Sequence, residues 1–346
     1  MRERVAGWLD RAGALGVAMT ARRLARVPTL SVVTFHHIAE DDPAYPYDRG
    51  VADATPAQFR RQIEWLARHG TPIRVADLLR ALDGEPLPRN AVMITFDDGY
   101  RSCREVALPI LREVGVPATF FIATAFVDDR RLYWWETIAL LVGQTRRKAA
   151  QLTYPRPIEL RLDEPGATRV LTDTIKDTEG LDLDRFLTEL AAALDVPWTR
   201  ELEARYADGL IMGWDDVRAI AADMDVESHG RRHRVLQTLS DAELADDLAG
   251  SRRDLEAQLG RPVQVIAYPV GRRVHRDERI RAALAAAGYR AGLSNHSGVN
   301  WWPWRRGATI DRFDLRRIAT DRAMSESMFA AQVAIPPLAY VSPHNR

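Results

Sequence analysis

An apolar run that ends in two adjacent aspartates constrains this chain more than any other feature. The run reads AVMITFDDGY over residues 91–100. Apolar and β-branched residues that stop at Asp-Gly predict a buried strand followed by a turn. Such a strand presents Asp97 and Asp98 together at one end of a sheet. Two carboxylates this close repel each other unless a cation lies between them or one of them takes a proton.

A downstream segment offers further ligands for a cation, in the sequence VESHGRRH over residues 226–233. Two histidine nitrogens and one carboxylate oxygen suit Zn²⁺ or another divalent transition metal, and they leave positions open for water and substrate. The spacing of His229 and His233 is a weak signal alone. Here Glu227 and Ser228 precede it at the end of an apolar strand. Because the strand ends of a parallel barrel share one face, we expect a hydrolytic metal site.

Composition narrows the classes of function. The chain has 346 residues, enough for one large α/β domain or two smaller ones, and 48 basic residues balance 48 acidic ones. Nucleic-acid binders normally carry a basic excess, so we expect no nucleic-acid partner. The single cysteine, Cys103, excludes a disulfide within the chain and a thiolate-rich metal site. We interpret Cys103 as a small buried residue instead of a redox or nucleophilic group.

Strand and helix candidates alternate along most of the chain. We expect strands over residues 30–38, 91–96, 118–123, 224–228, 263–268, 289–293 and 312–319, separated by helices over residues 56–70, 75–82, 102–113, 214–222, 240–259 and 276–287. This order is typical of a parallel α/β sheet or barrel. The pattern changes over residues 128–213, which we interpret as a mostly helical insertion with too few apolar residues for a separate core.

The ends of the chain have a different character. Residues 1–28 predict an N-terminal amphipathic helix that packs on the protein's own surface or lies on a membrane. Asp10 and Arg11 interrupt its apolar run, which argues against a secretory signal, and no run is long enough for a transmembrane helix. We therefore expect the cytoplasm or the inner membrane face as the location, and we interpret residues 336–346 as a tail.

Three motifs resemble those of the polysaccharide deacetylases, the family with the NodB-homology domain (carbohydrate esterase family four). They read TFDDGY over residues 95–100, SHGRRH over 228–233 and AYPVG over 267–271. The segments FHHI at 35–38, WW at 134–135 and LRRI at 315–318 are similar to further parts of the family. The resemblance covers residues 29–335, in the same order.

The resemblance implies a distorted (β/α) barrel of about seven strands. It also implies metal-dependent removal of an acyl group, usually acetyl, from an N-acylated amino sugar. By position, Asp98, His229 and His233 would hold the metal, and Asp97 would be the general base. Zn²⁺ is the ion we expect, with Co²⁺ or Mn²⁺ as alternatives. A divalent cation lowers the pKa of water at the site, and a nearby carboxylate can then take the proton.

The resemblance implies that the third motif stabilises the oxyanion that forms during hydrolysis. The resemblance assigns that role to the backbone N–H of Tyr268, with Pro269 setting the turn that aims it.

Two departures from the family pattern leave roles open. Many members have an arginine two residues before the motif proline, where this chain has Ala267. We expect Arg317 to pair with the base instead, although a surface arginine is an equal alternative. The family's late histidine, the general acid, has no clean copy. His296 is our candidate, and His275 is a weaker one.

Aromatic residues suggest a sugar-binding wall. We expect Tyr100 and Trp135 to bind substrate, together with His36 from the first strand. The segments YWW at 133–135 and WWPW at 301–304 offer faces that match pyranose rings. Packing of the insertion onto the barrel is the alternative for these rings.

The leading hypothesis is thus a deacetylase of amino sugars in a polysaccharide or lipid-linked saccharide. One alternative is a catalytically silent saccharide-binding module, because the general acid is uncertain. Another is a hydrolase of formylated sugars or cyclic amides on the same barrel. The oligomeric state is not determined by the sequence.

Overall fold

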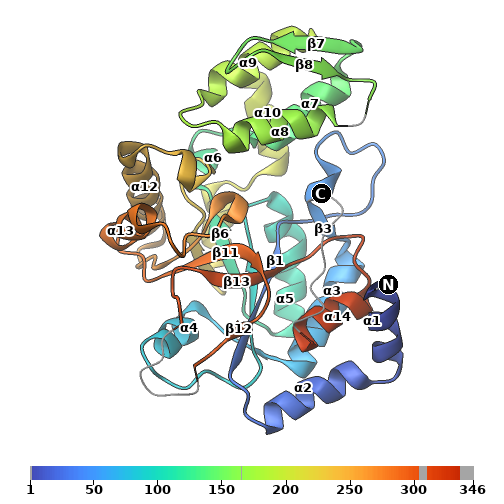
Figure 1. Ribbon diagram of the computed structural model, residues 1–346, viewed down its shortest axis with the longest axis vertical. Coiled ribbons are helices and arrows are strands. Elements are labelled where there is room, and N and C mark those ends of the chain that lie inside the picture. The colour runs from blue at the N-terminus through green and yellow to red at the C-terminus, as the bar shows by residue number, and fades with distance from the viewer. Residues whose placement is uncertain (1, 165, 304–309, 336–346) are drawn as a thin grey trace.

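Seven parallel strands close into a barrel at the centre of the molecule (Figure 1). The computed structural model describes residues 2–164, 166–303 and 310–335. The barrel strands are β1 (Thr29–Phe35), β5 (Ala91–Phe96), β6 (Thr119–Ile122), β9 (Asp225–Ser228), β10 (Val265–Ala267), β11 (Ala291–Ser297) and β13 (Leu315–Ala319). Their order is β1-β13-β11-β10-β9-β6-β5, and β5 pairs with β1 to close the ring. The predicted α/β barrel of seven strands is confirmed.

Short strands extend this sheet at its margins. The strand β12 (Asn300–Trp301) runs antiparallel beside the start of β1, and β4 (Thr71–Pro72) pairs with the start of β5. A separate pair, β2 (His37–Ile38) and β3 (Ala52–Ala54), follows the end of β1. The sequence analysis placed no strand between residues 38 and 91, so β3 was missed. A three-residue strand with an aspartate at its centre has no periodicity from which to recognise it.

Alternating side chains of the strands fill two separate cores. Leu30 and Val32 of β1 belong, with residues of β5, β6, β10, β11 and β13, to one buried cluster. Because these strands form the wall of the barrel, the cluster that they share fills its interior. Val33 and Phe35 of β1 belong to the second cluster, which joins the barrel to the surrounding helices. Every residue of β1 and β5 is buried, as a parallel sheet covered on both faces requires.

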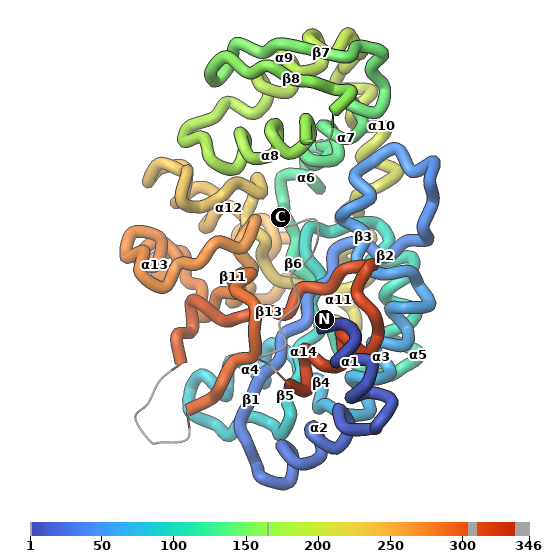
Figure 2. The backbone as a smooth tube through the Cα atoms, turned by 45° about the vertical axis from the view of Figure 1, so that its right-hand side comes forward, coloured from blue at the N-terminus to red at the C-terminus, as the bar shows by residue number. Residues whose placement is uncertain are grey.

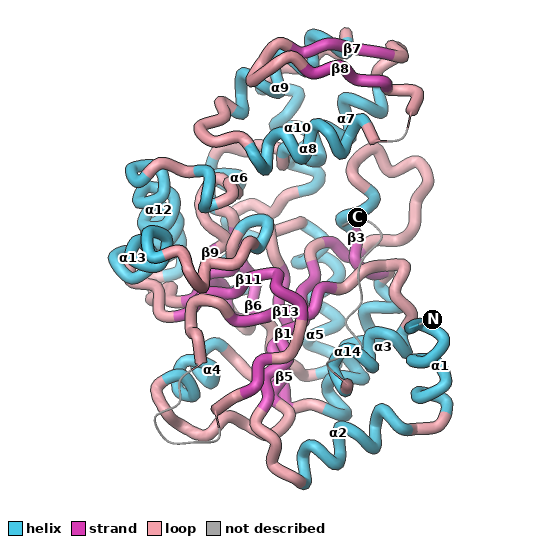
Figure 3. Tube along the Cα trace, in the orientation of Figure 1, coloured by secondary structure: helices cyan, strands magenta, loops and turns pink. Residues whose placement is uncertain are grey.

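Helices cover the outside of the barrel (Figure 3). They are α3 (Pro56–His69), α5 (Leu108–Val114), α11 (Trp214–Ala221), α12 (Asp241–Leu259) and α13 (Glu278–Ala286). The buried residues of α4 (Val75–Leu82) belong instead to the cluster inside the barrel. The predicted helix over residues 56–70 is α3, and it begins at a capping box in which the Thr55 hydroxyl accepts from the N–H of Gln58. A second capping box, Ser240 with Glu243, begins α12.

The insertion forms a lobe above the barrel in Figure 1. It contains α6 (Thr124–Asp128), α7 (Trp134–Gln144), α8 (Ala167–Asp177), α9 (Leu183–Leu194) and α10 (Arg200–Leu210), with a hairpin of β7 (Ala149–Leu152) and β8 (Ile158–Arg161). We expected few apolar residues here, but Leu171, Phe186 and Leu190 are fully buried in the cluster that reaches the barrel. Since the lobe follows β6, it leaves the barrel at the carboxyl ends of the strands.

The N-terminal segment folds as two helices, α1 (Arg2–Arg11) and α2 (Ala14–Leu24), instead of the single helix that we expected. Gly13 between them has φ of 69°, a left-handed conformation that interrupts a helix. Both helices pack against α14 (Glu326–Ala334), and Figure 2 shows the N-terminus beside it. The predicted tail lies outside the described residues. No helix in the described part of the chain is long and apolar enough to cross a bilayer.

We predict that Gly292→Ala destabilises the barrel. A Cβ at position 292 would lie 1.8 Å from the Tyr268 hydroxyl oxygen, and that hydroxyl donates to the Phe313 carbonyl at 2.7 Å. Displacing a buried tyrosine should lower the free energy of unfolding by about 1–3 kcal/mol in urea titrations. As a control, Gly209→Ala in α10 meets no atom within 4 Å. It should be neutral or stabilising by up to about 1 kcal/mol, and equal effects would contradict the prediction.

Candidate active site

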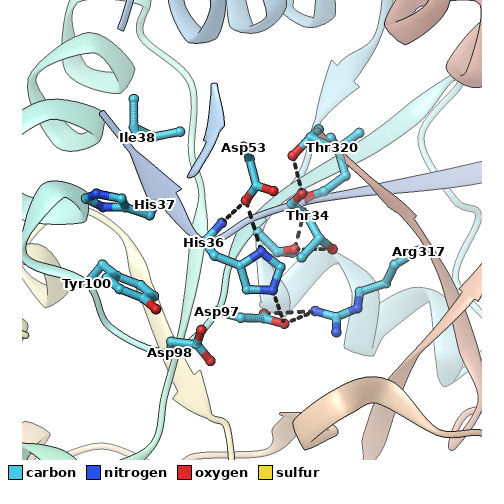
Figure 4. Close-up of polar contacts among 12 residues, drawn as sticks. Thr34, His36, His37, Ile38, Asp53, Asp97, Asp98, Tyr100, Arg317 and Thr320 are labelled. Carbon is cyan, nitrogen blue, oxygen red and sulfur yellow. Dashed lines mark hydrogen bonds and ion pairs between the residues drawn. The ribbon is translucent and has the colours of Figure 1, made fainter. Parts of the chain in front are cut away.

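A tight turn after β5 separates the two adjacent aspartates. The N–H of Asp97 continues the barrel ladder by donating to the Phe35 carbonyl at 2.9 Å. Asp98 has φ of 72° and Gly99 has φ of 103°, so the chain reverses at once. Aspartate tolerates this left-handed conformation better than most residues do. As a result, the Asp98 carboxylate lies apart from the contacts that Asp97 makes with Arg317 and His36 (Figure 4).

The end of β9 holds the first histidine in a defined orientation. His229 Nδ1 donates to the Ala267 carbonyl of the neighbouring strand at 2.8 Å. With the proton on Nδ1, the lone pair of Nε2 faces the site. Gly230 follows with φ of 72°, and a Cβ there would lie 2.6 Å from an oxygen of Asp247. The Asp247 carboxylate accepts from the backbone N–H groups of the next two residues and so shapes the loop to the second histidine.

Three ligand atoms converge at this end of the barrel. His229 Nε2 lies 3.2 Å and His233 Nε2 lies 3.3 Å from Asp98 Oδ1. All three side chains are buried, and Asp98 Oδ1 receives no hydrogen bond in the described structure. Lone pairs of a buried oxygen and a buried nitrogen facing each other are unfavourable without a cation between them. The set therefore fits a divalent metal ion, with no other protein ligand among the described residues.

The electrostatics of the three residues favour the same conclusion. Burial alone would raise the pKa of Asp98, but a proton on His229 or His233 holds this pKa well below its usual range, and a cation in the same place would act in the same direction. Burial lowers the pKa of His233. A deprotonated carboxylate and neutral imidazoles are the protonation states that metal binding requires. His233 also has φ of 49°, a strained backbone of the kind that collects at functional sites.

Asp97 faces an arginine instead of the histidine pair. Arg317 Nη1, from β13, donates to both carboxylate oxygens, at 2.8 and 2.6 Å. Both side chains are buried. Asp97 Oδ2 also lies 3.9 Å from His229 Nε2, so this carboxylate stands beside the candidate metal position without joining the ligand set. Many family members pair the base with an arginine of the third motif, where this chain has Ala267. Here Arg317 of β13 pairs with Asp97 instead.

A histidine from β1 completes the group. His36 Nδ1 bonds to Asp53 Oδ2 at 2.9 Å, and His36 Nε2 lies 4.0 Å from Asp97 Oδ2. In Figure 4 the imidazole lies between the two carboxylates. Burial would lower the pKa of His36, but the charge and hydrogen bond of Asp53 raise it, to about 9. Its side chain remains 28% exposed, whereas Asp97 is 1% exposed. Solvent therefore reaches this group at His36.

Sequence reasoning missed Asp53. It lies in β3, between two alanines, in a segment interpreted as a loop. Its carboxylate also accepts from the backbone N–H of His36, which ties β3 to the end of β1. An isolated aspartate between small residues carries no signal that a sequence pattern can detect.

Several expected site residues lie elsewhere. None of the described hydrogen bonds or ion pairs of His296 reaches Asp97 or Asp98. Its partial burial and the charge of Arg316 lower the pKa of this histidine. The Glu227 carboxylate accepts from the N–H groups at 264 and 265 instead of facing the metal position.

The predicted role of the Tyr268 N–H is wrong. This N–H donates to the Leu293 carbonyl at 3.0 Å, so the barrel ladder already uses it. Pro269, which has no N–H, packs beside the loop of the first histidine, since a Cβ on Gly230 would lie 3.4 Å from it. The next residue, Val270, has φ of 60°, which is strained for a β-branched side chain.

Two aromatic residues expected to bind sugar, Tyr100 and Trp135, are packed inside, whereas Trp301 is 57% exposed. Tyr100 is fully buried, its hydroxyl donates to Glu136 at 2.6 Å, and it accepts from Trp135 Nε1 at 2.8 Å. Burial raises the pKa of Glu136 to about 8. The ring centroid of Trp135 lies 4.6 Å from that of His233. Trp135 of α7 therefore packs against the ring of His233. Trp304 lies outside the described residues.

Comparison with known proteins identifies the family. A sequence profile described as polysaccharide deacetylase matches residues 84–292. The chain belongs to the polysaccharide deacetylase family. Members of this family are hydrolases that act on carbon–nitrogen bonds, so the predicted family and enzyme class are confirmed.

The curated relatives are similar over a short stretch. The poly-beta-1,6-N-acetyl-D-glucosamine N-deacetylase of Escherichia coli K12 is 34% identical over 98 residues, 28% of this chain and 14% of the relative. The enzyme of the same description from Staphylococcus aureus N315 is 33% identical over 78 residues, 22% of this chain and 27% of the relative. The matched stretch thus spans about a quarter or less of each relative.

Solved structures share the fold over nearly the whole chain. The deacetylase PplD of Streptococcus pyogenes, solved with acetate, superposes with a TM-score of 0.57 at 16% identity, covering 90% of this chain and 100% of that one. A polysaccharide deacetylase of Bacillus cereus gives a TM-score of 0.55 at 15% identity, covering 88% and 69%. At this level of identity the likeness supports the fold alone.

We predict that His229→Ala and His233→Ala each abolish metal binding. Each removes one of three ligands in a buried site, so zinc affinity should fall by at least about 100-fold. Elemental analysis and zinc titration of the purified variants provide the measurement. His275→Ala is the control, because this histidine is not part of the ligand set and should leave zinc content unchanged. Unchanged zinc content in both ligand variants would rule out the site.

Proposed function

We propose that this protein is a metal-dependent deacetylase that hydrolyses the N-acetyl amide of amino sugars in a polysaccharide or a lipid-linked saccharide. The observation that carries the proposal is the division of labour between the two aspartates: Asp98 faces two histidines, while Asp97 faces Arg317 and His36. The names of the curated relatives, which act on N-acetylglucosamine polymers, support the substrate class.

The ligand set supplies the electrophilic part of the reaction. Asp98, His229 and His233 would hold a divalent ion, for which we propose Zn²⁺, with Co²⁺ and Mn²⁺ as alternatives. Such an ion polarises a carbonyl oxygen and lowers the pKa of water. The Ala267 carbonyl keeps His229 in the tautomer that presents Nε2, so the protein prepares the site before the ion arrives.

Asp97 is placed to act as the general base. Its carboxylate lies beside the ligand set and can accept a proton from the water that attacks the acetyl carbon. Arg317 donates to both oxygens and so fixes the orientation of the carboxylate. The side chain of Asp97 therefore loses little rotational entropy when substrate binds. The arginine is therefore a positioning residue.

His36 is placed to act as the general acid, in the role for which the sequence analysis proposed His296. An amine is a poor leaving group unless its nitrogen is protonated as the C–N bond breaks. His36 Nε2 lies 4.0 Å from Asp97 Oδ2, so a substrate amide placed beside this pair would contact base and acid together. Asp53 bonds to Nδ1, which orients the ring and favours its protonated form.

The turn after β10 is our proposal for the oxyanion donor. The Tyr268 N–H is used within the barrel and Pro269 has none, so Val270 carries the first backbone N–H beyond them. Its strained φ of 60° indicates a backbone held in a special orientation.

We predict that Asp97→Asn removes deacetylation. Wild-type protein with Zn²⁺, Co²⁺ or Mn²⁺ should release acetate from oligomers of N-acetylglucosamine, and the variant should lose about 10²–10⁴ in kcat/KM, because asparagine cannot take a proton. Zinc content should stay the same, which separates the base from the ligands. Binding of oligomers by the wild type without acetate release would identify a silent binding module. Release of formate from formylated sugars, without release of acetate, would identify a hydrolase of formylated sugars.

We predict that His36→Ala lowers kcat/KM by about 10²–10⁴, whereas His296→Ala changes it by a few-fold at most. An acid must be protonated, so kcat/KM should fall as pH rises through the pKa of His36. A bound cation lowers this pKa from about 9, so the alkaline limb should lie at or below pH 9. Asp53→Asn removes the charge that raises the pKa and should move the limb to lower pH. A large loss in His296→Ala with an active His36→Ala would reverse the assignment.

A further inference from the structure

Exposed apolar side chains are concentrated on the two N-terminal helices. In the described part of the chain, six large apolar residues are strongly exposed, and four of them lie on α1 and α2. These four are Val5, Trp8, Val17 and Leu24, with exposed fractions of 42%, 63%, 68% and 74%. The two others, Val170 and Trp301, lie on different elements. Scattered exposed apolar residues are normal, but a concentration on one element indicates a contact surface.

Helical spacing places these residues together on the exposed face of each helix. Val17, Ala21 and Leu24 are four and three residues apart, so they share the outward face of α2. Thr20 lies on the same face, but its hydroxyl donates to the Gly16 carbonyl at 2.9 Å and is therefore satisfied within the helix. Trp8 lies on the exposed face of α1. We call this combined surface the outer face of α1 and α2.

The charge of the same segment is strongly positive. Residues 2–26 contain six arginines and two acidic residues, a formal net charge of +4, whereas the whole chain has a formal net charge of zero. Arg4, Arg11, Arg23 and Arg26 are exposed. The outer face therefore combines apolar side chains with a basic rim.

Both acidic residues of the segment bond to α14, the helix on which α1 and α2 rest. Glu3 accepts from the Ser325 hydroxyl, and Asp10 accepts from the Ser327 hydroxyl at 2.7 Å. These serines begin and continue the first turn of α14, on which the two helices rest. These contacts engage both carboxylates with α14, and the six arginines still leave the segment a formal net charge of +4.

The opposite side of the two helices is firmly attached to the protein. Ala6, Leu15 and Met19 are buried in the main apolar cluster. Arg22 Nη1 donates to the Val333 carbonyl at 2.7 Å, and the Asn90 side-chain amide donates to the Met19 carbonyl at 2.8 Å. The outer face is therefore presented by a packed element, and its exposure does not result from a loosely attached helix.

We propose that the outer face of α1 and α2 docks on an anionic lipid surface. Amphipathic helices with arginine beside a tryptophan and aliphatic residues bind in the interfacial region, where acyl chains receive the apolar side chains and acidic headgroups pair with the arginines. A second copy of this chain is a poorer occupant, because two such faces would bring like charges together. The contact is independent of the proposed deacetylation.

The test is cosedimentation of the full-length protein with vesicles of phosphatidylcholine alone or with phosphatidylglycerol. The protein should bind the anionic vesicles, and binding should weaken as salt is added. Trp8→Ser combined with Leu24→Ser should lower the partition coefficient by on the order of tenfold or more. Arg4→Gln combined with Arg23→Gln should have an effect of similar size.

Matched controls use exposed residues away from the outer face. Trp301→Ser removes a tryptophan that is 57% exposed, and Arg205→Gln combined with Arg253→Gln removes two exposed charges; both controls should bind like the wild type. Urea unfolding should show that all variants fold. Absence of the wild type from anionic vesicles, or equal losses in test and control variants, would overturn the proposal. The wild type could instead be a dimer in light scattering and fail to bind vesicles. If Trp8→Ser combined with Leu24→Ser then converted the dimer to a monomer, the outer face would be assigned to a second copy of the chain.

Discussion

The chemistry of this protein depends on the turn that separates two neighbouring carboxylates. Without it, Asp97 and Asp98 would repel each other at the end of β5. The left-handed backbone at Asp98 directs its side chain to two histidines, while Asp97 remains against Arg317. Each charge thus has its own partners, and a buried site with two carboxylates becomes stable. The turn thus gives two consecutive carboxylates different surroundings, and on these the proposed roles of ligand and base rest.

The closed barrel brings the remaining groups to these carboxylates. The strands β1, β5 and β9 end on the same face, so His36, Asp97 and His229 meet although they are far apart in the chain. The β10 carbonyl that orients His229 and the β13 arginine that orients Asp97 come from neighbouring strands. The insertion adds Trp135 behind His233. Each reactive group is therefore supported by an element other than its own.

The corrections have common physical causes. His296 follows an apolar strand late in the chain, yet its described contacts do not reach the aspartates. The sequence reading placed the Tyr268 N–H at the site, but the parallel ladder uses it. Asp53 was overlooked because a two-residue pairing between β2 and β3 has no periodicity. In each case hydrogen bonding between distant segments decided which polar group was available, and such pairing is invisible to local patterns.

The amino-acid sequence by itself determined the alternation of strands and helices, the Asp-Asp-Gly strand end and the His-x-x-x-His segment, because apolar periodicity and motif spacing are local properties. From these the barrel and the candidate ligand set followed. Only the tertiary structure decided that Arg317 serves Asp97, that His36 and Asp53 form a pair, and that the acidic residues of α1 bond to α14. These contacts join residues that are distant along the chain, and closure of the barrel selects them.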